Sequence, residues 1–82
     1  MVKKIYITKY SVLKGIQVFE AEVDRIKENE AYISFYDQGY LQMFNKDDAT
    51  FDESVAKERF RAKVENELAK LEKRKQKLLE LI

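Results

Sequence analysis

Residues 52–82 are the segment that most limits how this chain can fold, because they contain neither glycine nor proline. The segment is rich in alanine, leucine, glutamate, lysine and arginine, the residues that most favour an α-helix. A helix of about 30 residues rises roughly 45 Å, whereas a strand of ordinary length spans about 20 Å. We therefore predict one long C-terminal helix that extends well beyond any sheet formed by the rest of the chain.

The start of this helix carries two alternative capping signals. Thr50 and Glu53 have the spacing of a capping box, in which two side chains reciprocally accept hydrogen bonds from exposed backbone N–H groups. Asp52 is the alternative N-cap. Asp47 and Asp48 precede it, but the three aspartates lack the glycine and the terminal glutamate of an EF-hand loop. We assign them to helix capping rather than to metal binding.

Residues 3–44 show the alternation of apolar and polar positions that is typical of β-strands. Ile5 and Ile7 share one face of the first strand, and Leu41 and Met43 share one face of the last. The first strand is predicted to begin near residue 3, and three further strands are predicted at residues 16–26, 31–36 and 40–44. We predict an α+β fold, in which a four-stranded antiparallel meander or small SH3-like barrel precedes the helix. The chain is predicted to form a single domain, 1–82, with the meander at 1–46 and the helix at 50–82.

Short segments connect the predicted strands. Residues 11–15 are predicted to form a turn that ends at Gly15. The apolar residues Ile16 and Val18 fall on the face opposite to that of Phe19, Ala21 and Val23. A β-bulge or sharp bend is therefore expected near Val18. Three further segments are predicted as turns or linkers: residues 27–30, 37–39 and 45–49.

Apolar side chains recur along the predicted helix with two different spacings. Steps of four residues are typical of packing against a twisted sheet, and alternating steps of three and four are typical of a coiled-coil seam. We expect four residues to cover the sheet: Val55, Ala56, Phe60 and Val64. We expect six residues to form a homodimer or to contact another protein: Val64, Leu68, Leu71, Lys75, Leu78 and Ile82.

Within this predicted interface, Leu71 and Leu78 are the expected anchors of a dimer. Lys75 lies in the seam and is expected to weaken pairing or to set its register. The alternative is that the helix bends back along the sheet and that its last residues simply fray.

Five tyrosines fall on or next to the predicted strands, where they are possible sheet-face contacts: Tyr6, Tyr10, Tyr32, Tyr36 and Tyr40. Exposed tyrosines on one face would form a platform for a partner, because their rigid rings bury much area at low entropic cost. The alternative is cross-strand aromatic pairing that only stabilises the sheet.

Four cations in the second half of the predicted helix are possible phosphate contacts: Lys70, Lys73, Arg74 and Lys77. They favour a small nucleic-acid-binding regulator that uses this basic face. The alternative is that they offset the dipole at the helix C-terminus. The net charge of +1, from 16 basic and 15 acidic residues, provides no overall attraction to nucleic acid.

The composition argues against an enzyme, because the chain contains no cysteine and no histidine. A thiolate nucleophile, an imidazole base and the usual ligands of zinc or haem are therefore absent, and we expect no cofactor and no metal. Glu20, Glu22 and Asp24 alternate along a strand and are interpreted as its solvated face. No segment has the roughly 20 apolar residues of a membrane span or the apolar core of a signal peptide. We expect a cytoplasmic protein with no membrane contact.

The segment from Ile7 to Ile16, ITKYSVLKGI, followed by strands and a helix rich in lysine, glutamate and leucine, resembles a group of short proteins of phages, prophages and bacterial mobile elements. This resemblance implies an origin in a mobile element, a location in the bacterial host cytoplasm and binding to a host protein. It assigns no catalytic or ligand residue. From these observations we predict a non-enzymatic protein-interaction module. The alternatives are a small nucleic-acid-binding regulator and a subunit of a larger particle.

Overall fold

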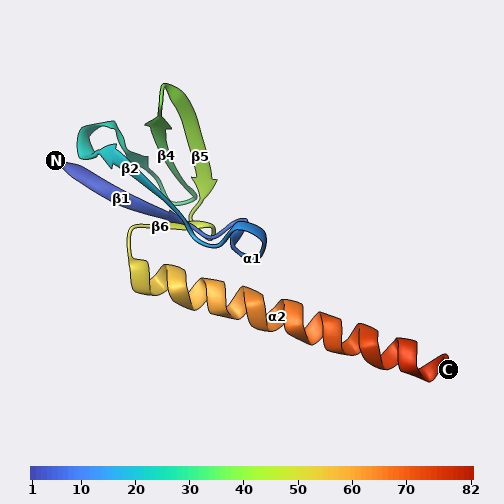
Figure 1. Ribbon diagram of the computed structural model, residues 1–82. Helices are drawn as coiled ribbons and strands as arrows, with labels where there is room; N and C mark the ends of the chain where they lie inside the picture. Colours follow the sequence, from blue (N-terminus) through green and yellow to red (C-terminus); the bar gives the residue numbers. More distant parts are fainter.

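The computed structural model describes residues 1–82 and has an α+β fold, with antiparallel strands in two small sheets and one long C-terminal helix (Figure 1). The strands are β1 (Val2–Ile7), β2 (Gln17–Glu22), β3 (Lys27–Glu28), β4 (Tyr32–Asp37), β5 (Tyr40–Asn45) and β6 (Ala49–Thr50). The helical elements are α1 (Ser11–Lys14), the 3-10 turn η1 (Val23–Arg25) and α2 (Glu53–Glu80). The α+β class and the long helix are confirmed, but the strands form neither a single meander nor a closed barrel.

The first sheet has the strand order β2-β1-β6. Ile5 and Ile7 of β1 are fully buried, as the alternation predicts. Strands β1 and β2 pair without interruption from Val2 opposite Glu22 to Ile7 opposite Gln17. The bulge predicted near Val18 is therefore wrong, because Val18 simply points away from the core side that Phe19 faces.

The chain changes direction at η1, five residues after the bend expected near Val18. Val23 donates its backbone N–H to the carbonyl of Met1, and the N–H of Ile26 is bonded back to the carbonyl of Val23. This turn ends β2 at Glu22, within the strand predicted at residues 16–26. It carries the chain from the first sheet into the second, and Lys27 and Glu28, predicted as part of a turn, pair with β4 instead.

The second sheet has the order β3-β4-β5. Gln38 and Gly39 join β4 to β5 with φ angles of 49° and 84°, as a two-residue type I′ turn requires. Ile33 is paired with Phe44, so these side chains share the inner face. Leu41 and Met43 share one face of β5, as the alternation predicts, but this is the outer face, where both are more than half exposed. The aromatic ring of Phe44, on the opposite face, fills the core instead.

The two sheets meet through a small core of aromatic and aliphatic side chains. The ring centroids of Phe19 and Phe35 are 5.4 Å apart, and those of Phe35 and Phe44 are 6.3 Å apart. These rings connect β2 of one sheet with β4 and β5 of the other. The fully or almost fully buried apolar residues around them are Ile5, Ile7, Ala21, Ile33, Phe35 and Ala49.

Two segments predicted as turn or linker contain regular structure. Residues 11–14 form the single helical turn α1, which Gly15 ends with a φ of 73°. Ala49 and Thr50 form β6 and pair with Ile7 and Tyr6 of β1. Strand β6 places the start of α2 directly beside the first sheet, with α1 on the same side (Figure 1).

Candidate functional site

Helix α2 begins at Glu53, and Asp52 is its N-cap. The Asp52 carboxylate accepts hydrogen bonds from the hydroxyl of Ser54 at 2.6 Å and from its backbone N–H at 2.9 Å. These bonds, together with one from the N–H of Val55, lower the pKa of Asp52. The capping box of Thr50 and Glu53 is not formed, because Thr50 belongs to β6 and its hydroxyl accepts from the N–H of Asp52. The alternative signal, Asp52, is the cap.

The first half of α2 is fixed to the sheets by one side of the helix. Ala56 is fully buried, and Val55, Phe60 and Val64 are partly buried. Arg59 reaches over this side and donates to the carbonyls of Lys46 and Ala49 at 2.9 and 3.2 Å. Of the four residues predicted to cover the sheet, Val55, Ala56, Phe60 and Val64, only Ala56 is fully shielded from solvent.

The second half of α2 has no support from the rest of the chain. Every residue from Leu68 to Ile82 is exposed, and α2 extends far past the sheets in Figure 1. The molecule measures 59 × 24 × 22 Å, which excludes a helix that bends back along the sheet. Four apolar side chains on one side of this segment form what we call the apolar stripe: Leu68, Leu71, Leu78 and Ile82.

The side chains of the apolar stripe are exposed to solvent and lie along a shallow groove. Leu68, Leu71 and Leu78 are 59%, 58% and 58% exposed, although a leucine is normally shielded from water. Lys75 lies between them on the same side of the helix. Leu71, Leu78 and Ile82 line a shallow groove of about 300 Å³. Of the six residues predicted for the interface, only Val64 lies within the supported half of the helix.

At its inner end the stripe adjoins an apolar recess that the sequence analysis did not predict. Ile16, Phe60 and Val64 line this recess, whose volume is about 420 Å³, together with Lys57, Arg61 and Glu65. Ile16 follows Gly15 on the loop between α1 and β2. The sequence contains no local signal for this contact, because Ile16 is distant from Phe60 along the chain.

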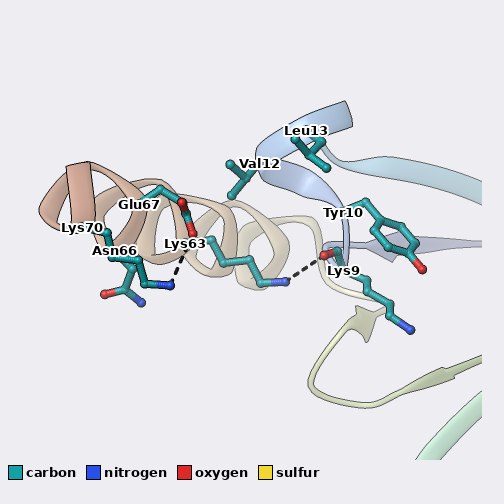
Figure 2. A pocket seen from close by; sticks show the side chains of 8 residues that line it. All are labelled: Lys9, Tyr10, Val12, Leu13, Lys63, Asn66, Glu67 and Lys70. Carbon is teal, nitrogen blue, oxygen red and sulfur yellow. Dashed lines mark hydrogen bonds and ion pairs between the residues drawn. The ribbon is translucent and has the colours of Figure 1, made fainter. Parts of the chain in front are cut away.

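A second hollow, a cleft of about 500 Å³, lies between α1 and α2 (Figure 2). Lys63 crosses it and donates from Nζ to the carbonyl of Thr8 at 2.7 Å. Tyr10, Val12 and Leu13 line its α1 side, and Lys70 lies at its outer end, ion-paired with Glu67 at 3.5 Å. The cleft has a mixed lining and is open to solvent, so it has no enclosed ligand site.

The four predicted phosphate contacts all lie on the unsupported half of α2. Lys70, Arg74 and Lys77 project on one side of the helix, and Lys73 lies next to them, since each residue advances about 100° around the axis. All four side chains are exposed. They lie beside the apolar stripe, and Arg74 also lines its groove.

The five predicted tyrosines do not share one surface. Tyr32 and Tyr36 lie on the outer face of the second sheet, where the strand register also places Leu41 and Met43. Tyr6 belongs to the first sheet, Tyr10 precedes α1, and Tyr40 lies at the end of the β4–β5 hairpin. Only the pair Tyr32 and Tyr36 can act together.

No helix of the protein combines the length and the apolar character needed to cross a membrane. Comparisons of the chain with protein-family models, with curated proteins and with solved structures gave no match.

Proposed function

We propose that this protein is a non-enzymatic protein-interaction module that binds another polypeptide through the apolar stripe of α2. The observation that supports the proposal is the exposure of Leu68, Leu71 and Leu78 on a helix that extends beyond its own sheets. Sheltering each leucine from water contributes about 1.5–3 kcal/mol. A partner that covers the stripe gains this stabilisation, because the isolated chain leaves these leucines in contact with water.

The spacing of the stripe favours a helical partner. Leu68, Leu71, Lys75, Leu78 and Ile82 follow one another at alternating steps of three and four residues. This is the pattern with which two helices pack side by side. The partner therefore presents its own helix with a matching apolar seam.

The resemblance of Ile7 to Ile16 to proteins of phages and mobile elements gives this binding a biological setting. In that setting the module acts in the bacterial host cytoplasm, where it binds and modulates a host protein. Small proteins of this kind act by occupying a surface in stoichiometric amounts, which requires no catalytic group. The absence of histidine and cysteine is compatible with this mode of action.

Charge-introducing variants of the stripe test the proposal. Leu71→Glu and Leu78→Glu change side chains that are more than half exposed, so the fold of the monomer is expected to persist. Wild-type protein is compared with both variants by sedimentation equilibrium and by affinity capture of proteins from the native host. Binding to itself or to a host protein is expected for the wild type and lost in both variants.

The matched control is Leu13→Glu, because Leu13 is 85% exposed on α1 and lies outside the stripe. It is expected to behave as the wild type. The proposal is wrong if the stripe variants retain every association of the wild-type protein.

A second candidate function, nucleic-acid binding, is favoured by the grouping of Lys70, Lys73, Arg74 and Lys77 on the unsupported half of α2. It predicts binding that weakens steeply as salt is added, because phosphate contacts release counterions. Gel shifts with single- and double-stranded DNA and with RNA at about 50 mM salt test it. Retention that is lost in the double variant Lys73→Gln and Arg74→Gln supports this candidate, and no retention by the wild type eliminates it.

A further inference from the structure

The apolar stripe and the apolar recess form one continuous surface. With about 100° of rotation per residue, Phe60 and Leu78 point in the same direction from the axis of α2. Val64, Leu71 and Ile82 fall within about 40° of that direction. The surface therefore begins at the recess of Ile16, Phe60 and Val64 and continues along the unsupported half of the helix.

We infer that the occupant of this surface is a second copy of the chain, packed antiparallel with the two Leu71 side chains on the two-fold axis. This inference rests on the proposed function, because it names the partner of the same stripe. In an antiparallel pair centred on Leu71, residues 78–82 of one copy lie opposite residues 60–64 of the other. Leu78 and Ile82 of each copy then fill the recess of its companion.

In this arrangement the free end of each helix lies beside the first half of the other copy's α2. The side chains of Arg59 and Lys63, which bond α2 to the rest of its own chain, lie about 60–100° around the axis from Phe60, on the side away from Val64. The paired segment, residues 60–82, is about 33 Å long. Neither recess is complete without side chains from the second copy, and both are filled by the same symmetric contact.

The charges beside the stripe favour the antiparallel orientation over the parallel one. Glu67 and Arg74 flank the stripe on the same side, one heptad apart. An antiparallel pair places Glu67 of one copy beside Arg74 of the other, twice by symmetry. A parallel pair in register instead places Glu67 beside Glu72 of the other copy.

Lys75 also favours the antiparallel orientation over the parallel one. A parallel pair sets the two Lys75 ammonium groups against each other inside the seam, whereas the antiparallel pair sets Lys75 near Glu67 of the second copy. The antiparallel pair does bring the two Glu72 carboxylates near each other on the opposite flank. Lys75, one turn away on the same helix, lies between Glu72 and the stripe and offsets that repulsion.

Single-cysteine variants of the full chain test the arrangement directly, since the chain has no cysteine of its own. Leu71→Cys is expected to form a disulfide-linked dimer on mild oxidation. Leu78→Cys alone is not, because two copies of residue 78 lie about 21 Å apart along an antiparallel pair, beyond the roughly 7 Å limit for Cα atoms joined by a disulfide. A mixture of Val64→Cys and Leu78→Cys chains is expected to cross-link one to the other.

A charge exchange provides a second measurement. Glu67→Arg is expected to weaken the dimer about fivefold in Kd, because it places two cations side by side at two symmetric positions. The double variant Glu67→Arg with Arg74→Glu is expected to restore the wild-type Kd. In a parallel dimer Glu67→Arg would strengthen binding, since it would remove the contact between Glu67 and Glu72.

Each outcome is decisive. Cross-linking of Leu71→Cys and of the mixed pair supports the antiparallel dimer. Efficient cross-linking of Leu78→Cys to itself overturns that arrangement but leaves the stripe as a protein-binding surface. A wild-type monomer at about 100 μM, well above the dissociation constants of specific complexes, overturns the second copy as the partner. The proposed function then depends on whether Leu71→Glu and Leu78→Glu lose a captured host protein.

Discussion

The Nζ atom of Lys63 on α2 donates a hydrogen bond to the carbonyl oxygen of Thr8 at 2.7 Å, joining residues that are 55 positions apart in the chain. The same Nζ atom lies 3.8 Å from the Oδ1 atom of Asp48. Thr8 is fully buried, and its backbone N–H donates to the carbonyl of Asp48 at 2.8 Å. Lys63 thus fixes the direction in which α2 leaves the sheets, and with it the direction of the apolar stripe.

Lys63→Met is expected to lower the free energy of unfolding by about 1–2 kcal/mol, because it removes a charge-assisted hydrogen bond that is partly shielded from water. Urea denaturation followed by circular dichroism measures this change. Lys70→Met is the control: its ion pair with Glu67 is exposed, so a loss of less than about 0.5 kcal/mol is expected. Equal effects of the two substitutions would show that the Thr8 contact does not hold the helix.

Asp52→Ala is expected to lower the urea midpoint near neutral pH, because it leaves the N–H groups of Ser54 and Val55 without their cap. Hydrogen bonds hold the pKa of Asp52 below its ordinary value of 3.8. The stabilisation is therefore present above the pKa of the unfolded chain and is lost as the pH falls through the lower folded pKa. The difference between wild type and Asp52→Ala should therefore shrink as the pH falls below the ordinary value of 3.8.

The control for this pH series is Asp47→Ala, since Asp47 is exposed and lies outside the helix. It is expected to have the wild-type midpoint at each pH. A difference between wild type and Asp52→Ala that stays constant as the pH falls far below 3.8 would contradict the role of the ionised cap.

Gly39→Ala is expected to cost about 1 kcal/mol of stability, because Gly39 has a φ of 84° that a side chain disfavours. No atom lies within 4 Å of the added methyl group, so the cost is that of the backbone alone. Gln38→Asn is expected to have the opposite sign and to stabilise the type I′ turn by a few tenths of a kcal/mol. Thermal or urea unfolding of the two variants should therefore move in opposite directions.

Lys75→Leu is expected to tighten the self-association of α2 at least about tenfold in Kd, because it replaces the one charged residue of the seam with an apolar side chain. Lys73→Leu makes the same chemical change on another side of the helix and is expected to leave the Kd near its wild-type value. Sedimentation equilibrium over a range of concentrations measures both. An unchanged Kd for Lys75→Leu would argue that Lys75 is outside the contact.

The double variant Leu41→Lys and Met43→Lys is expected to change stability by less than about 0.5 kcal/mol, because both side chains are more than half exposed. Strand β5 is an edge of its sheet and carries no charged residue, so it is open to pairing with other chains. The lysines are expected to reduce light scattering by concentrated protein. A large loss of stability would instead show that this face is covered.

The sequence by itself determined the long helix and the buried faces of β1 and β4, whereas the structure decided between the two capping signals in favour of Asp52. These features follow from local chemistry: no glycine or proline interrupts residues 52–82, and Ile5 with Ile7 and Ile33 with Phe35 alternate with more polar neighbours. The turn at Gln38 and Gly39 also follows from local chemistry, because the single glycine is enough to favour a turn. The prediction that the helix exceeds its sheet followed from its length alone.

The tertiary structure alone decided where the chain crosses between the sheets, which face of β5 is buried, and what lies beside the start of the stripe. The pattern of residues 16–26 predicts one strand, yet the chain turns at Val23 and then enters the second sheet. Phe44 is partly buried against the core and Met43 is exposed, because the pairing of Phe44 with Ile33 directs its side chain to the inner face. Ile16 and Phe60 line the same recess although they are far apart in the sequence. Such contacts depend on pairing between distant segments, which the pattern of any one segment does not specify.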